Sequence, residues 1–148
     1  MLPTAETVWK PAATSLAIVS VLKHVYVAVA ALFAACVVVQ VFLAGLAIFV
    51  GPSAWALHTG FIHYFEYLPI LLLAIALIGR MRGLRWPPLV LLLLIGVQYA
   101  TAEWADPSSR AVAAIHPVSA MIIFQGAIWL TWRAWRSARA AVPASGHA

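Results

Sequence analysis

The sequence predicts an all-α polytopic membrane protein: an antiparallel bundle of four transmembrane helices with both termini in the cytoplasm. Of its 148 residues, 65% are hydrophobic and 9% are charged, whereas a soluble domain carries about 25% charged and roughly 45–50% apolar residues. This composition leaves too little polar surface to cover a soluble globule. The apolar residues form long uninterrupted segments, and most of the Lys and Arg residues flank those segments.

The apolar segments cover about residues 25–50, 57–79, 87–102 and 112–132. About 20 helical residues cross the roughly 30 Å of hydrocarbon in a bilayer. None of the segments shows the alternation of a barrel strand, so we expect helices, which satisfy their own backbone hydrogen bonds in lipid. Residues 1–136 are expected to form a single transmembrane domain, and the small, polar residues 137–148 a disordered tail.

Each segment has features that support its assignment. The first stays apolar well past any plausible signal-peptide cleavage point, so we interpret it as a retained helix. The second begins near His58 and contains Pro69, which is expected to kink it. The third carries Gln98 near its end, and the fourth begins near His116. The connections GPSAWA, RMRGLRWP and EWADPSSR are short, which makes neighbouring helices antiparallel. A histidine near the start of both even-numbered helices also suggests a repeated helical hairpin.

Orientation follows from the positive charges. The N-terminal segment, the middle connection and the C-terminal region hold eight of the nine Lys and Arg residues. The positive-inside rule therefore places both termini and the middle connection in the cytoplasm. Because the cationic residues flank apolar runs and form no continuous stripe, we expect no nucleic acid partner. The single cysteine, Cys36, excludes an intramolecular disulfide.

Polar side chains from all four segments gather in the outer half of the expected bundle, while the inner half is almost purely aliphatic. A polar group in lipid costs several kcal/mol unless it faces the bundle interior and finds a partner. Convergence in one half therefore indicates a shared interior site. The candidate site residues are His58, His116, His63, Gln98, Gln40 and Glu66.

Helical geometry limits what this site can hold. His58 and His63 are about 140° apart around a helix and cannot easily chelate one small ion, whereas His63 and Glu66 can hydrogen-bond along one face. His58 and His116 come from different helices at matching depth. Two such imidazoles can approach a flat cofactor from opposite sides, which is the geometry of bis-histidine haem. We therefore predict that His58 and His116 ligate a haem iron, with His63 as the alternative ligand to His58.

The residues VVQVFLAGLAIF, LHTGFIHYFEYLPILLLAIALIGR and IHPVSAMIIF, with a glutamine late in the third helix, resemble a family of small four-span bacterial membrane proteins of unknown function. This resemblance covers about residues 25–132 and implies a bacterial inner membrane location. More distantly, the layout resembles one half-bundle of haem A synthase, which implies haem ligation by His58 and His116. The glutamate-containing motif that precedes the histidine in the synthase is absent here, and there is one bundle instead of two. The resemblance therefore implies haem binding or electron transfer without hydroxylation.

Three functions are compatible with these residues. The first is a haem b protein for electron transfer or haem handling, with the lipid bilayer and a quinone or redox protein as partners. The second is a non-catalytic accessory subunit or assembly factor of a homo-oligomer or larger membrane complex, with the histidines as structural hydrogen-bond partners. The third is a copper or zinc site built from His58, His63 and His116, because imidazole suits both metals.

Overall fold

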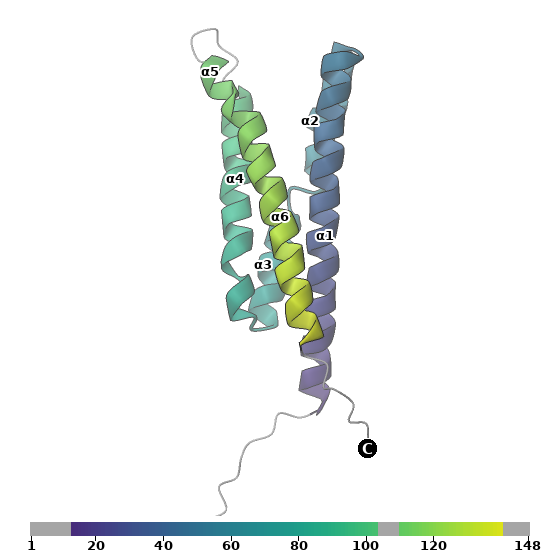
Figure 1. Ribbon diagram of the computed structural model, residues 1–148, viewed down its shortest axis with the longest axis vertical. Helices are drawn as coiled ribbons and strands as arrows, with labels where there is room; N and C mark the ends of the chain where they lie inside the picture. Colours follow the sequence, from purple (N-terminus) through teal and green to yellow (C-terminus); the bar gives the residue numbers. More distant parts are fainter. Residues whose placement is uncertain (1–12, 104–109, 141–148) are drawn as a thin grey trace, which may run out of the picture.

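A computed structural model describes residues 13–103 and 110–140, and every regular element in these ranges is a helix (Figure 1). Four helical stretches are long and apolar enough to cross a membrane: Leu16–Phe49, Pro52–Ile78, Arg82–Ala102 and Ala111–Arg139. The prediction of an all-helical chain with four candidate membrane spans is therefore confirmed.

The first span is a single long helix, α1 (Ala13–Phe49). It begins 12 residues before the start expected at residue 25. We expected the helix to begin after Lys23 and His24 because that expectation rested on hydropathy alone. The helix continues through both residues because their side chains find acceptors: Lys23 Nζ donates to the Ser137 carbonyl at 3.1 Å, and His24 Nδ1 lies 2.8 Å from the Ser20 carbonyl. No glycine or proline interrupts residues 13–44.

The second span is broken, whereas the sequence led us to expect one kinked helix over residues 57–79. A 3₁₀ turn η1 (Pro52–Ala54) leads into α2 (Trp55–Phe61), a second turn η2 (Ile62–Tyr64) follows, and α3 (Leu68–Ile78) resumes the span. Pro69 lies in the first turn of α3 and has no N–H to donate to the Phe65 carbonyl. The Leu68 N–H bonds that carbonyl instead, at 3.0 Å. The missing donor explains why the helical ladder is interrupted just before Pro69.

The second half of the chain contains η3 (Arg82–Leu84), α4 (Trp86–Glu103), α5 (Arg110–Ala113) and α6 (Ile115–Arg139). Helix α4 differs from the expected 87–102 by one residue at each end. Helix α6 continues seven residues beyond the expected end at 132, so residues 137–139, expected in a disordered tail, are helical. The Lys23–Ser137 hydrogen bond ties this last turn to α1. Residues 141–148 of the expected tail lie outside the described ranges.

Helix α1 packs mainly against α6 and α3, and α4 packs against α6 and α3. The face that α6 buries carries small and medium side chains about one turn apart: Ser119, Ile123, Ala127, Leu130, Ala134 and Ala138. Small residues allow membrane helices to approach closely. Large apolar side chains point outward along every span, among them Val38, Phe42, Ile70, Leu93 and Ile122. An apolar exterior around a thin core is the pattern expected of a bundle surrounded by lipid.

The core has an internal repeat with a constant offset of 58 residues. Buried positions of α1, of α3 and of the break before α3 recur at this offset as buried positions of the η3–α4 region and of α6. The matched pairs are Tyr26 and Leu84, Ala30 and Pro88, Phe33 and Leu91, Val37 and Ile95, Phe65 and Ile123, Pro69 and Ala127, Leu72 and Leu130, and Ala76 and Ala134. The polar residues Gln40 and His58 recur at the same offset as Gln98 and His116. The chain is therefore built from two similar units in the same register.

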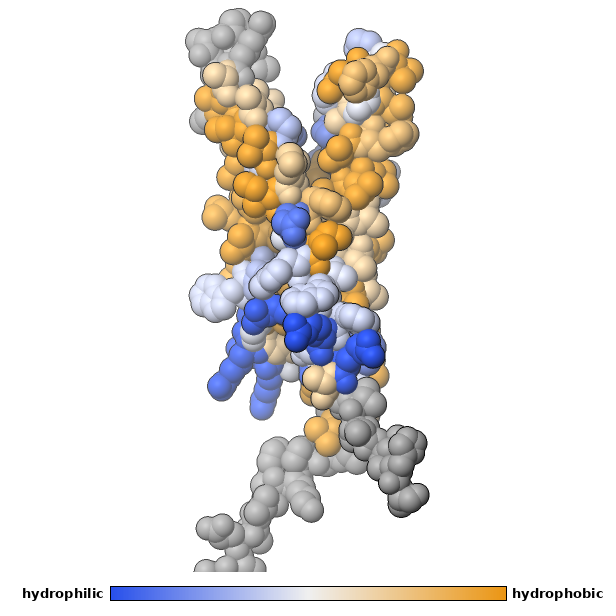
Figure 2. All heavy atoms as spheres, viewed as in Figure 1, coloured by the Kyte–Doolittle hydropathy of each residue, from blue (hydrophilic) through white to orange (hydrophobic). Residues whose placement is uncertain are grey.

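The two ends of the molecule differ in polarity and shape. Figure 2 shows hydrophilic side chains gathered at the end where α1 begins and α6 ends. At the other end the surface is hollowed between two mainly apolar arms, one built from α1 and α2 and the other from α4 and α6. Helix α2 carries His58 and the start of α6 carries His116, so the candidate histidines come from opposite arms.

Candidate functional site

His58 and His116 lie ring to ring. Their centroids are 6.4 Å apart and their planes are inclined by 55°. Both residues are half-buried. The structure thus brings His58 and His116 together, as we expected from their matching depth. Their role as ligands stays a prediction.

Each histidine is held by the glutamine of the preceding helix in its own unit. His58 Nδ1 lies 3.0 Å from the Gln40 backbone carbonyl, and His116 Nδ1 lies 3.1 Å from the Gln98 backbone carbonyl. Each histidine follows its glutamine by 18 residues, so the two units make the same contact. A carbonyl oxygen only accepts hydrogen bonds, so each Nδ1 carries its proton and each Nε2 keeps a lone pair in the neutral ring. This is the tautomer of a histidine that binds a metal through Nε2.

The contacts around the two histidines differ in one respect. At His58, the Gln40 side chain closes a second bond, because its Nε2 donates to the His58 carbonyl at 2.8 Å. At His116, the Thr101 hydroxyl lies 3.3 Å from Nδ1 and donates to the Val97 carbonyl at 2.7 Å. Both arrangements fix the orientation of the imidazole ring relative to the preceding helix.

Both glutamines also present a buried oxygen without a partner. The described residues contain three buried, unpartnered polar side-chain atoms, and two of them are Gln40 Oε1 and Gln98 Oε1. Leaving such an acceptor unpaired costs about 1–3 kcal/mol, and most buried polar atoms in native structures have a hydrogen-bond partner. The repeated unit thus places an unsatisfied acceptor in the same residue that orients each histidine.

The donor set fits an axial pair on one metal ion. An imidazole nitrogen binds a metal at roughly 2 Å and lies about 1 Å from its ring centre, so two rings on opposite sides of one ion have centroids about 6 Å apart. The observed spacing of 6.4 Å matches this value. The hollow between the two arms in Figure 2 separates the same helices that carry the two rings. The spacing of the two rings therefore allows both imidazoles to be axial ligands of one iron.

Aromatic side chains adjoin the pair on the side of α2. Trp55 meets the His58 ring edge-on with centroids 5.5 Å apart. Phe61, Phe65 and Phe33 form a cluster in which Phe61 and Phe65 are 5.2 Å apart and Phe33 and Phe65 are 5.9 Å apart. This cluster belongs to the packed core of the bundle.

His63 and Glu66 form a separate polar group. His63 Nδ1 lies 3.1 Å from Glu66 Oε1, and the Tyr99 hydroxyl donates to Glu66 Oε2. The His63 side chain is 63% exposed and the Glu66 side chain 13%. This group joins the break before α3 to α4. Within the described ranges no hydrogen bond or ring contact connects His63 to His58 or His116.

The three histidines of the expected copper or zinc site do not gather into one cluster in the described part of the chain. Among the described residues, no three His, Cys, Asp or Glu side chains cluster closely enough to hold an ion. His63, the third ligand of the expected copper or zinc site, pairs with Glu66 instead. The site that remains consists of the two opposed imidazoles.

Sequence reasoning missed the acceptors of the two Nδ1 protons. Gln40 and Gln98 were expected to contribute side chains. The Gln40 side chain does so through its bond to the His58 carbonyl, but the Nδ1 atoms of both histidines are held by glutamine backbone carbonyls. Backbone acceptors leave no mark in residue type. The equal spacing of 18 residues between glutamine and histidine in both halves is the signal that identifies them.

Comparison with known proteins gives one match. The profile of a family of unknown function, DUF6220, matches residues 40–105, a little under half of the chain. The matched range begins at Gln40, includes His58, Glu66 and Gln98, and ends before His116. This similarity agrees with the expected likeness to a family of unknown function. No curated protein and no solved structure matches the chain, so the likeness to haem A synthase receives no support.

Proposed function

We propose that this protein binds haem b between His58 and His116 and serves electron transfer or haem handling in a bacterial inner membrane. The observation that carries the proposal is the opposed pair itself, two rings 6.4 Å apart that each bond a glutamine carbonyl through Nδ1. Each Nε2 thereby keeps its lone pair in a neutral ring and can donate that pair to iron.

The chain's own residues would prepare and shield this site. The Gln40 and Gln98 carbonyls hold the Nδ1 protons, fix the ring orientations and increase the basicity of the Nε2 atoms. Trp55 meets the His58 ring edge-on and packs beside it. Haem with two axial imidazoles supplies one-electron transfer and leaves no open iron position for oxygen chemistry.

The proposal includes a membrane orientation. We place both termini and the α3–α4 turn in the cytoplasm, with the four spans antiparallel and the histidines near the outer face. The cationic residues at the end opposite the histidines support this orientation through the positive-inside rule. A quinone in the outer leaflet or a redox protein would exchange electrons with the site.

Absorption spectroscopy of the purified protein tests ligation directly. We expect near-stoichiometric haem b, measured as a pyridine haemochrome, in protein purified in detergent from cells supplied with a haem precursor. His58→Ala and His116→Ala should each lose the reduced α-band and most of the bound haem, because each removes one of two iron ligands.

Two histidine variants serve as controls. His24→Ala removes a histidine whose Nδ1 also bonds a carbonyl, at the other end of α1, and His63→Ala removes one held by Glu66. Both should keep the haem spectrum. Retention of haem by both the His58 and His116 variants would contradict the proposal, and loss in His63→Ala alone would identify His63 as the ligand.

The second candidate is a non-catalytic accessory subunit or assembly factor in which the histidines are structural. The Gln40–His58 pair favours it, because its two reciprocal hydrogen bonds join α1 to α2 without any cofactor. This function predicts a colourless protein that copurifies with another membrane protein. A coloured, monodisperse protein without a partner would exclude it.

A further inference from the structure

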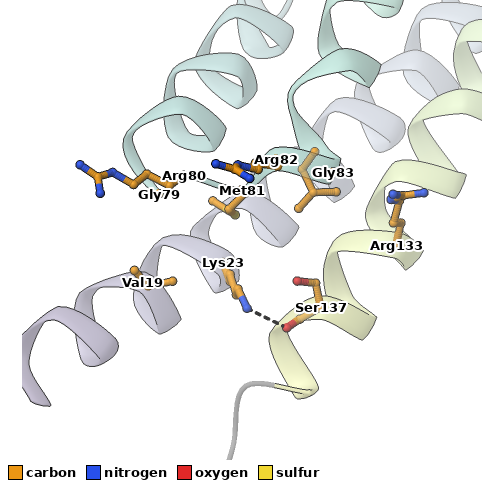
Figure 3. A pocket seen from close by; sticks show the side chains of 10 residues that line it. Val19, Lys23, Gly79, Arg80, Met81, Arg82, Gly83, Arg133 and Ser137 are labelled. Carbon is orange, nitrogen blue, oxygen red and sulfur yellow. Dashed lines mark hydrogen bonds between the residues drawn. The ribbon is translucent and has the colours of Figure 1, made fainter. Parts of the chain in front are cut away.

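A basic pocket lies at the end of the molecule opposite the histidines. It has a volume of about 410 Å³ and is built from α1, the turn between α3 and α4, and α6 (Figure 3). The residues that matter here are Lys23, Arg80, Arg82, Gly83, Arg133 and Ser137. The pocket shares no residue with the histidine site, so ligand binding in the pocket does not require haem.

The pocket is strongly cationic. Four of its ten lining residues are Lys or Arg, and none is Asp or Glu. The one ion pair among the described residues, His63–Glu66, involves none of these cations. Like charges gathered in a partly enclosed site repel each other. A bound anion would offset that repulsion.

Three of the cations surround the cavity from three different elements. In Figure 3 the side chains of Lys23, Arg82 and Arg133 surround the space between α1, the α3–α4 turn and α6, while Arg80 points away from it. Lys23 Nζ is fixed by its bond to the Ser137 carbonyl at 3.1 Å. The Arg133 guanidinium lies 5.2 Å over the Trp129 ring and so close to Gly83 that a Cβ there would be 3.0 Å from Nη2. Lys23 and Arg133 are therefore held in place before any ligand binds.

A sharp turn brings Arg82 to this position. Arg80 adopts a left-handed conformation with φ of 51°, where glycine is the usual residue. The Met81 N–H bonds the Ala76 carbonyl at 2.8 Å and the Arg80 N–H bonds the Leu77 carbonyl at 3.1 Å, which completes a Schellman motif. Just after the pocket, the Nε of Arg85 is buried without a partner.

The depth and chemistry of the pocket identify the ligand class. The second and third candidate spans end at Ile78 and begin at Arg82, so the pocket lies at the level of the lipid headgroups. Arginine presents a planar fork that matches phosphate oxygens, and lysine adds a point charge. Basic pockets between membrane helices bind anionic headgroups. We propose that Lys23, Arg82 and Arg133 bind the phosphate group of an anionic ligand, supplied by a phospholipid headgroup or by a soluble phosphate compound.

Native mass spectrometry and thermal unfolding of delipidated protein in detergent test this site. Phosphatidylglycerol, phosphatidylcholine and inorganic phosphate are titrated separately. If the source is a lipid, phosphatidylglycerol should give bound adducts and raise the unfolding temperature, while phosphatidylcholine and inorganic phosphate should not. If the source is soluble, inorganic phosphate alone should raise the unfolding temperature. No effect from either anion would overturn the proposal.

Matched variants separate the pocket from general surface charge. Arg82→Gln/Arg133→Gln should weaken anion binding by at least about tenfold, because each cation near a headgroup contributes strongly. Arg136→Gln/Arg139→Gln removes equal charge, but these side chains stack over Trp132 and Trp135 at 4.7 and 4.8 Å outside the pocket. This control should bind within about twofold of the parent protein. Equal losses in the two double variants would overturn the pocket assignment.

A further variant keeps the charge and changes only the geometry. Gly83→Ala places a methyl group 3.0 Å from Arg133 Nη2, so the guanidinium must shift by a few tenths of an ångström. It should weaken anion binding while the circular dichroism spectrum stays unchanged. If the double glutamine variant does not fold, the single variants Arg82→Gln and Arg133→Gln replace it, and unchanged binding in both would overturn the proposal.

Discussion

At the scale of single residues, Gln40 contributes two separable groups to the site. Its backbone carbonyl accepts from His58 Nδ1 at 3.0 Å, and its side-chain Nε2 donates to the His58 carbonyl at 2.8 Å. Its Oε1 is buried and has no partner. A substitution at residue 40 removes the side-chain amide but keeps the backbone carbonyl that holds the His58 ring. It therefore tests separately whether the amide contacts a ligand.

We predict that Gln40→Leu lowers the free energy of unfolding by about 1 kcal/mol or less. One hydrogen bond is lost, but a buried unpaired oxygen is removed with it. Haem content should stay near that of the parent protein, because the acceptor for His58 Nδ1 is unchanged. Denaturation in mixed micelles followed by circular dichroism, together with the haemochrome assay, measures both quantities. Haem loss as complete as in His58→Ala would mean that Oε1 contacts the ligand.

At the scale of elements, the break between α2 and α3 positions the short helix that carries His58. Phe65 has φ of −134° and ψ of −6°, outside helical geometry. Pro69 cannot donate to its carbonyl, and Leu68 takes that bond. The Glu66 side chain within the break bonds Tyr99 of α4. The direction of α2, and with it the position of the His58 ring, therefore depends on an interruption that one residue maintains.

We predict that Pro69→Ala allows α2 and α3 to approach one continuous helix. The backbone amide that this substitution introduces can donate to the Phe65 carbonyl, so backbone amides near Phe65 should exchange with deuterium more slowly. Haem content should fall, because a straighter span moves His58 relative to His116. Unchanged exchange between Phe65 and Leu68 would show that tertiary contacts alone maintain the break, and Pro52→Ala at η1 is the matched control.

At the scale of the whole molecule, hydropathy was enough to predict the class and the number of candidate spans. The boundaries that failed, at the start of α1 and the end of α6, fall where polar side chains find partners in the folded chain, as Lys23 does at Ser137. The meeting of His58 and His116 followed from depth and helix direction. The glutamine carbonyls were missed because residue type does not mark a backbone acceptor. The basic pocket was missed because its cations come from three elements that are far apart in the sequence.

The proposed orientation predicts which surfaces reach the outside of the cell. In a Cys36→Ala background, Ser53→Cys at the α1–α2 connection should react with a membrane-impermeant maleimide in intact cells. Ala140→Cys after α6 should react only after the membrane is opened, because the positive end is cytoplasmic. Residues 53 and 140 are both exposed. Labelling therefore depends on the side of the membrane on which each residue lies, and not on burial. The reverse labelling pattern would place the histidines on the cytoplasmic side.

The constant offset of 58 residues has an evolutionary consequence. Duplication of a gene for one helical hairpin, followed by head-to-tail fusion, would produce this register. The single-hairpin ancestor would have needed a second copy of itself to bring two identical histidines together. The copies have since diverged: Met121 and Phe124 now stand at the positions equivalent to His63 and Glu66. The acid and its imidazole partner persist beside one histidine only. One unit of the present chain therefore carries an ionisable pair where the other carries two apolar side chains, so the two units are no longer interchangeable.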